Sequence, residues 1–296
     1  MSKLVTIQND SIIVTISTLG AEVQSIKHLD NERLWQADEK FWKGHSPLLF
    51  PICGRLKENY YLHNDYKYEM RIHGIARNSE FEILSHEKAS ITLGFSSSEE
   101  SKKVYPFDFK YKVMYKLNGD AMQTYYFVEN TGNSPLYYNV GSHEAYVING
   151  ANFEDYSIKF EDGETVKVTA IIDNFMSDEK YELPTYKGVF DLKKAYFDMQ
   201  SIMPNGKPSL DSVVLEDVPS KRATLLYKGE PTLSVYYNDF KNMVLWTTLP
   251  ADYLAIEVWS GIPDENKTTH ILSEKKGIEK LEKGESKTYY HSVTFY

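Results

Sequence analysis

The sequence predicts an antiparallel all-β fold, and three observations carry that prediction. Apolar and polar residues alternate with a period of two over many short segments, which is the pattern of a strand with one buried face. Gly, Asn and Asp residues end these segments at short intervals, as in a sandwich or a barrel. Tyr, Phe and Trp, which favour strands, make up 14% of the 296 residues.

The clearest predicted hairpin begins at Phe107. Odd-numbered positions from Phe107 to Leu117 are aromatic or aliphatic, whereas most even-numbered ones are charged. Asn118-Gly119 then supplies a tight turn, because both central residues of a type I′ turn need a positive φ. The return strand runs from Met122 to Val128. The same pattern predicts further strands, which in chain order are Ile91–Phe95, Leu136–Val140, Ser157–Phe160, Thr165–Ile171, Ala223–Tyr227, Thr232–Tyr237, Met243–Thr248, Tyr253–Trp259 and Thr288–Phe295.

Helices are expected to contribute little, since no long segment shows a period of 3.6 residues. The best short candidates are Asp38–Trp42 and Asp191–Met199. The run Leu272–Lys287 mixes acidic and basic residues and is predicted to be a solvated loop. No repeat or linker divides the chain, so we expect one large β domain over residues 1–296.

Composition narrows the class of protein. The 33 basic and 42 acidic residues give a net charge of −9, which argues against nucleic acid or an anionic membrane as the main partner. The single cysteine, Cys53, permits no internal disulfide. The first ten residues lack the apolar core of a secretory signal, and no apolar stretch reaches the roughly 18 residues that span a bilayer. We therefore expect a cytoplasmic protein, and its oligomeric state stays open.

Two glycine-containing segments present basic side chains. Arg55 follows Gly54, and its guanidinium can either donate several hydrogen bonds to substrate oxygens or form a surface salt bridge. His73 precedes Gly74, which permits either close approach of a ligand to the backbone or a simple turn. The residues alone leave both choices open.

His143 and Glu257 are the strongest candidates for proton chemistry. His143 follows the predicted strand Leu136–Val140 among small residues, and an imidazole that titrates near neutral pH can act as general acid or base. Glu257 lies in the middle of the apolar strand Tyr253–Trp259, where a carboxylate is costly to bury unless it is paired or functional. Ala255 and Trp259 share its face, so this face is either the floor of a binding site or exposed to solvent.

These segments together resemble a known family. Gly54-Arg55, His73-Gly74-Ile75-Ala76-Arg77, Gly141-Ser142-His143 and Ile256–Gly261, in this order, are similar to the aldose 1-epimerase (galactose mutarotase) family and to its LacX-like branch in particular. The resemblance extends from about Asn9 to Tyr296. It implies a large antiparallel β-supersandwich that interconverts the α and β anomers of a free aldose hexose, with no cofactor and no metal.

The resemblance also implies a role for each residue. Glu257 would be the general base that takes the proton of the anomeric hydroxyl O1, and His143 the general acid that protonates the ring oxygen O5, on the opposite side of the pyranose. His73 and Arg55 would hold the sugar. Asp211 stands where an aspartate of the family binds sugar hydroxyls.

The chain departs from the family's usual residues at three positions. Glu144 follows His143 and Val258 follows Glu257, where the family often has proline, and Ile75 follows His73-Gly74, where phenylalanine is common. A carboxylate next to His143 is expected to raise the pKa of its imidazole. Arg71 and Arg77 are predicted to form salt bridges or to contact a phosphate.

Three other functions stay open at this point. A hexose-phosphate mutarotase would use the same proton-transfer groups. A non-catalytic carbohydrate-binding protein would use the aromatic pocket alone. A metal-dependent hydrolase or oxygenase would need His73, His143 and Glu257 to form a two-histidine, one-carboxylate metal site.

Overall fold

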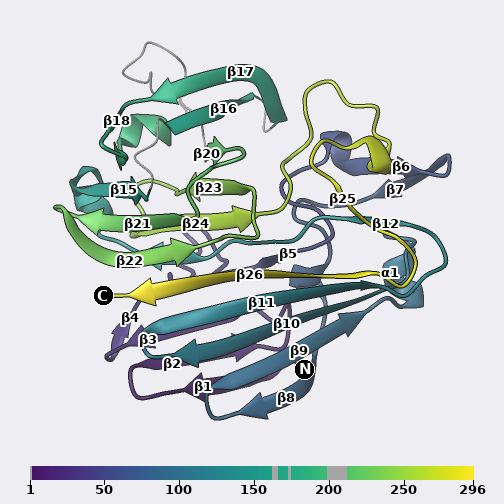
Figure 1. Cartoon of the computed structure of the whole chain (residues 1–296), viewed down its shortest axis with the longest axis horizontal. Coiled ribbons are helices and arrows are strands. Elements are labelled where there is room, and N and C mark those ends of the chain that lie inside the picture. The colour runs from purple at the N-terminus through teal and green to yellow at the C-terminus, as the bar shows by residue number, and fades with distance from the viewer. Residues whose placement is uncertain (1, 162–165, 173–174, 199–211) are drawn as a thin grey trace.

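Two large antiparallel sheets pack against each other and form the body of the structure (Figure 1). The computed structural model describes residues 2–161, 166–172, 175–198 and 212–296. Each strand pair within a sheet in these ranges is antiparallel, which confirms the predicted fold class.

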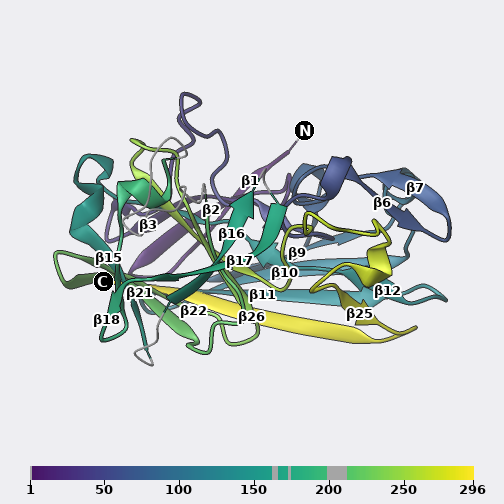
Figure 2. The same cartoon turned by 90° about the horizontal axis from the view of Figure 1, so that it is seen from above.

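The larger sheet has ten strands. In spatial order these are β18 (Thr185–Tyr186), β19 (Val189–Asp191), β15 (Tyr156–Phe160), β21 (Arg222–Tyr227), β22 (Glu230–Tyr236), β26 (Ser286–Phe295), β11 (Ala121–Asn130), β10 (Phe109–Asn118), β9 (Ser90–Ser96) and β8 (Glu82–Glu87). Figure 2 shows β26 extending along the molecule, where it pairs with β11 and β22.

The second sheet has eight strands. Seven follow in the order β17 (Phe175–Leu183), β16 (Val166–Ile172), β20 (Ser212–Leu215), β23 (Asn242–Trp246), β24 (Tyr253–Trp259), β13 (Gly141–Ser142) and β5 (Leu48–Leu49), and β14 (Ala145–Val147) also pairs with β24. This sheet matters for function because β13 and β14 flank His143 and β24 contains Glu257.

The remaining elements are small. A four-stranded sheet consists of β1 (Leu4–Gln8), β2 (Ile12–Ser17), β3 (Val23–His28) and β4 (Asn31–Glu32), and two pairs are β6 (Tyr60–His63) with β7 (Tyr66–Glu69) and β12 (Leu136–Tyr138) with β25 (Glu279–Leu281). The α-helix α1 (Glu99–Lys102) and the 3₁₀ turns η1 (Lys57–Asn59), η2 (Ala76–Asn78), η3 (Gly150–Asp155), η4 (Lys194–Tyr196) and η5 (Leu272–Glu274) connect strands. No helix among the described residues is long and apolar enough to cross a membrane.

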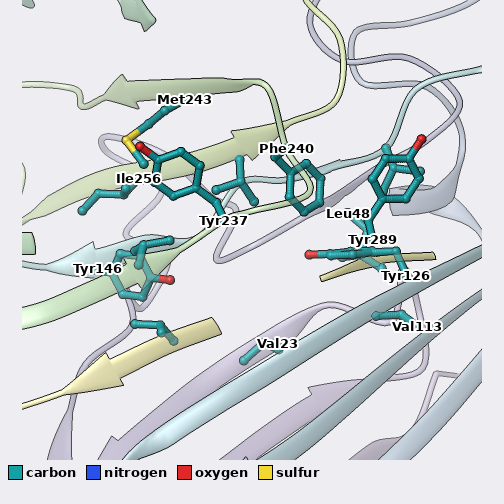
Figure 3. Packing of buried hydrophobic residues seen from close by; sticks show 14 of the residues in the cluster. Val23, Leu48, Val113, Tyr126, Tyr146, Tyr237, Phe240, Met243, Ile256 and Tyr289 are labelled. Carbon is teal, nitrogen blue, oxygen red and sulfur yellow. The ribbon is translucent and has the colours of Figure 1, made fainter. Parts of the chain in front are cut away.

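The core lies between the two large sheets and is rich in tyrosine (Figure 3). Val113 and Tyr126 project from the larger sheet toward Met243 and Ile256 of the other. Along β10, each odd-numbered residue is buried, as the alternation predicted. Buried tyrosines bring a hydroxyl that needs a partner, and Tyr115 donates to a backbone carbonyl 2.8 Å away.

Both helix predictions were largely wrong. The segment Asp38–Trp42 forms a turn, in which the amide of Trp42 donates to the carbonyl of Asp38 over 3.0 Å. In Asp191–Met199 the described residues contain the last residue of β19 and the 3₁₀ turn η4, and no α-helix. The ring contacts of Trp42 with His143 and Trp246 take precedence over the weak helical propensity of so short a segment.

The run Leu272–Lys287 was wrongly predicted to be a solvated loop throughout. It contains η5, β25 and the first residues of β26. Lys275 is buried, and its ammonium lies 3.2 Å from the equally buried carboxylate of Asp264. The acidic partner comes from outside the run, so the local charge pattern could not reveal that pairing.

Phe50 connects the core to the segment that contains His73. Its buried ring stacks on Tyr111 with 4.6 Å between ring centroids. Its amide donates to the carbonyl of His73, and its carbonyl accepts hydrogen bonds from the amides of Ile75 and Ala76. Packing of Phe50 in the core therefore fixes the backbone position of His73.

Replacing Phe50 should test this connection. Phe50→Ala is expected to lower the free energy of unfolding by about 3–5 kcal/mol, because a large buried side chain is deleted. Urea titration measures the change. Tyr66→Ala is the control, since Tyr66 is 69% exposed, and should change the free energy by about 0.5 kcal/mol or less. A loss for Phe50→Ala no larger than that of the control would contradict the argument.

Candidate functional site

A cavity of about 350 Å³ brings most of the sequence-predicted site residues together. Arg55, His73, His143 and Glu257 all line it. Asp211 lies outside the described residues, although its neighbour Ser212 lines the cavity. The other lining residues are Trp42, Gly54, Ile72, Arg77, Ile171, Val214, Val244, Trp246, Trp259 and Pro263.

Glu257 is buried in the middle of β24, with 1% of its surface exposed. This excludes an exposed sheet face. Leu254, Ile256 and Val258 point into the main core, so Glu257 lies on the opposite face, as the period of two predicted. Its Oε2 accepts a hydrogen bond of 3.0 Å from Nε1 of Trp259. Burial raises the pKa of Glu257 well above its usual range, although that hydrogen bond acts in the opposite direction.

His143 faces Glu257 across a short gap. The imidazole Nε2 lies 3.4 Å from Oε1 of the carboxylate, and both side chains are almost fully buried. The two groups therefore lie next to each other, which corrects the expectation that they stand on opposite sides of a sugar ring. They can reach the two oxygens bonded to one carbon at the same time.

Aromatic rings enclose His143. Trp42 stacks on the imidazole with 4.8 Å between centroids and 21° between planes, and Trp246 meets it edge-on at 5.5 Å. Burial lowers the pKa of His143 to about 3. The charge of the neighbouring Glu144 acts to raise this pKa, as expected, but the effect of burial is larger. The imidazole is therefore neutral at pH 7 when nothing is bound.

His73 owes its position to a left-handed turn. His73 and Gly74 have φ values of 66° and 75°, and a side chain on Gly74 would lie 2.4 Å from the carbonyl oxygen of Phe50. The glycine is thus needed for backbone packing rather than for access of a ligand. Nδ1 of His73 accepts the amide hydrogen of Gly54 over 3.1 Å, so the neutral ring carries its proton on Nε2. Burial keeps the ring neutral by lowering its pKa.

Two arginines line the cavity. Arg55 donates from Nη1 to the side chain of Asn59 over 3.2 Å and forms no salt bridge with a described residue. The guanidinium of Arg77 has neither a hydrogen-bond nor an ion-pair partner within the described ranges, so the salt bridge expected for it is not found there. Arg71 does not line this cavity but a groove of about 1450 Å³, which shares Arg55 and Ile72 with it.

Sequence reasoning missed the contribution of Trp42 and Trp246. Trp42 lies in a polar segment, where the adjacent aromatic pair Phe41-Trp42 was a signal that could have indicated a buried contact. Its position is held by Trp35, whose indole nitrogen donates to the carbonyl of Trp42 over 2.8 Å. Trp246 is close to Glu257 only because β23 pairs with β24.

The described residues contain no group of three or more His, Cys, Asp or Glu side chains that could hold a metal ion. Nδ1 of His73 is already engaged by Gly54, and Nε2 of His143 faces Glu257. The arrangement does not fit the metal site considered from the sequence.

Comparison with known proteins identifies the family. The model of the family described as aldose 1-epimerase matches residues 3–294. The chain belongs to the aldose 1-epimerase family. It is also 30% identical over 293 residues to the plasmid and the chromosomal LacX proteins of Lactococcus lactis subsp. lactis, with 93% of either chain covered.

Solved structures agree with this membership. A galactose mutarotase related enzyme from Lactobacillus acidophilus superposes with a TM-score of 0.90 at 29% identity, over 99% of this chain and 97% of that one. A galactose mutarotase-like protein from Lactobacillus casei gives a TM-score of 0.89 at 24% identity, over 99% and 100%. The first supports a mutarotase-type role on a sugar, and the second shows the shared fold.

The protonation state of His143 can be observed directly. In ¹⁵N NMR spectra we expect the ring to stay neutral at pH 5, because its pKa is about 3. Trp42→Ala uncovers one face of the imidazole, so the pKa should rise toward its ordinary value of about 6.5. A doubly protonated His143 at pH 6 in the unaltered protein would contradict the role given to burial.

Proposed function

We propose that this member of the aldose 1-epimerase family exchanges the anomers of a free aldose hexose, with Glu257 and His143 as its proton-transfer groups. The observation that carries the proposal is the 3.4 Å contact between Oε1 of Glu257 and Nε2 of His143 inside a sugar-sized cavity. Anomer exchange needs one proton removed from O1 and one delivered to O5, and both oxygens are bonded to the same carbon.

The proposed reaction starts from a Glu257 carboxylate and a His143 imidazolium, which form when the proton of the buried Glu257 carboxyl group passes to Nε2 of His143 across their 3.4 Å contact. Glu257 takes the proton of O1 while His143 gives its proton to O5, the C1–O5 bond breaks, and C1 becomes the carbon of an aldehyde. Rotation about C1–C2 presents the other face, and ring closure reverses both transfers. Two protons are transferred and one C–O bond is broken and re-formed without oxidation or reduction, so the reaction needs no cofactor.

Burial supports these roles. A raised pKa makes Glu257 a stronger base, and a lowered pKa makes His143 a stronger acid. Both transfers therefore convert the charged pair into the neutral pair that a buried site favours. The short distance between the two charges stabilises the starting state.

His73 and Arg55 are proposed to hold the sugar. Nε2–H of His73 remains available as a donor because Nδ1 is bonded to Gly54. Arg55 has donors beyond the one used by Asn59. Asp211 keeps its predicted role as a hydrogen-bond partner of sugar hydroxyls, and that role stays a prediction.

Loss of either proton-transfer group should remove most of the activity. Glu257→Gln and His143→Asn are each expected to slow anomer exchange by about 10²–10⁴-fold, the usual contribution of general acid–base catalysis. Polarimetry of freshly dissolved α-glucose and α-galactose in a weakly catalytic buffer at pH 7 measures the rate. Glu82→Gln is the control, because Glu82 is an exposed residue of β8.

Two results would refute the proposal. Wild-type rates in a folded Glu257→Gln or His143→Asn protein would remove that residue from the mechanism. Saturable sugar binding without any acceleration by the unaltered protein would favour a non-catalytic carbohydrate-binding protein.

A hexose phosphate is the second candidate substrate, and Arg77 is the observation that favours it. A half-buried guanidinium that lines the cavity without a partner among the described residues is suited to an anionic group. The charge of Glu22 acts on this guanidinium from beyond hydrogen-bond distance, whereas the neutral hydroxyls of a free sugar offer it no negative charge at all.

Comparing glucose with glucose 6-phosphate tests this candidate. If phosphate binds Arg77, Arg77→Gln should lower kcat/KM for the phosphate ester by about ten- to a hundredfold, because that is the usual contribution of a hydrogen bond to a charged group. Arg71→Gln should leave it unchanged, because Arg71 does not line the cavity. Equal or faster exchange of the free sugar by the unaltered protein would exclude the phosphate preference.

A further inference from the structure

Glu144, which follows His143 in the sequence, is a second buried carboxylate next to the site. It is 3% exposed, and its Oε1 lies 3.0 Å from Nε2 of His291, which is 1% exposed. Oε2 of Glu144 accepts the hydroxyl of Ser142. The other ring nitrogen of His291 lies 3.3 Å from the hydroxyl of Tyr126, whose ring lies in the core (Figure 3). None of these groups lines the cavity.

This buried pair is connected to Glu257 by hydrogen bonds. The carbonyl of Ser142 accepts Nε1–H of Trp259 over 3.2 Å, and the same N–H donates to Oε2 of Glu257 over 3.0 Å. Trp259 is therefore held between Ser142 and Glu257, and Ser142 is held by Glu144. The backbone adds a second connection, since the amide of Ile256 donates to the carbonyl of Glu144.

Glu144 is also a source of negative charge. Burial opposes its ionisation, but the charge and hydrogen bond of His291, with the Ser142 hydroxyl, lower its pKa. Three tyrosines face it: Tyr115, Tyr126 and Tyr146. Burial, with the charge of Glu144, raises their pKa values, so their hydroxyls stay neutral. The same charge adds to the effect of burial in raising the pKa of Glu257, and it opposes the effect of burial in lowering the pKa of His143.

Stability alone is a weak reason for such a pair. Taking two charges out of water costs several kcal/mol per ion, and apolar side chains of similar volume often stabilise a core equally well. Loss of His291 would also leave the buried carboxylate of Glu144 without its partner. A function in the neighbouring site explains the arrangement better.

We propose that Glu144, held by His291, is a positioning residue for the Glu257–His143 pair: through Ser142 it fixes the indole N–H of Trp259 on Glu257, and it places a negative charge behind both proton-transfer groups. This inference rests on the proposed function. It adds to that function a residue which touches neither the sugar nor the transferred protons.

The test combines Glu144→Gln with polarimetry over a range of pH. The variant is expected to lower kcat about tenfold with KM within twofold, because sugar contacts are retained and only the proton transfers are affected. Both limbs of the pH profile of kcat should move to lower pH, because removing a negative charge lowers the pKa of Glu257 and of His143. A purely structural role would lower stability and leave the pH profile in place.

Two further variants keep the result interpretable. Glu144→Met combined with His291→Leu removes the carboxylate together with its partner, and should move the pH profile in the same direction even if Glu144→Gln does not fold. Asp120→Asn is the matched control, because Asp120 forms another histidine–carboxylate contact, 3.0 Å from His28. It should change neither kcat nor the pH profile.

A measurement without turnover separates this inference from the proposed function. ¹³C NMR of the Glu257 carboxyl should give a lower pKa in the Glu144 variants than in the unaltered protein. An unaltered protein that does not accelerate anomer exchange would overturn the proposed function, and with it the kinetic role of Glu144. An active protein whose folded Glu144 variants keep the wild-type kcat, pH profile and Glu257 pKa would overturn the inference alone.

Discussion

The burial of the Glu257 carboxylate is the constraint on which the site depends. All seven residues of β24 are buried, so this strand must lie between packed layers on both faces, with an acidic group in its middle. The surrounding polar groups offset part of that cost: Trp259 donates to one carboxylate oxygen and His143 faces the other. Strand pairing brings both contacts into place, since β24 lies beside β13 and β14, which flank His143.

Much of the fold could be predicted from the sequence, because the alternation of apolar and polar residues follows directly from the burial of one face of a strand. Strands β9, β10, β11 and β24 lie close to their predicted ranges. In each, the pattern of apolar residues follows from whether one face of the strand is buried or both. Of the site, the sequence indicated Glu257 as a carboxylate in an apolar strand and His143 as a histidine among small residues. The residues around Glu257 and His143 marked each of them as a candidate. That they belong to one site followed from the resemblance of the ordered motifs to the aldose 1-epimerase family.

The rest depends on contacts between distant segments, which a local pattern cannot contain. The stacking of Trp42 on His143 and the pairing of Lys275 with Asp264 both join residues from separate parts of the chain. The lowered pKa of His143 also follows from three-dimensional burial, which outweighs its sequence neighbour Glu144. Asp211 was proposed from resemblance alone and lies outside the described residues.

The contact between Tyr126 and His291 has a consequence for how the chain acquires its structure. These residues are 165 positions apart in sequence, yet they lie on neighbouring strands of one sheet. On the ribosome, β10 and β11 emerge as a hairpin long before β26 is made, so one edge of β11 carries unpaired backbone groups in the meantime. Such an edge invites pairing with other chains, and contacts of this sequence separation form slowly. The strand that supports the buried polar network is thus also the strand that closes this edge and protects the nascent sheet from aggregation.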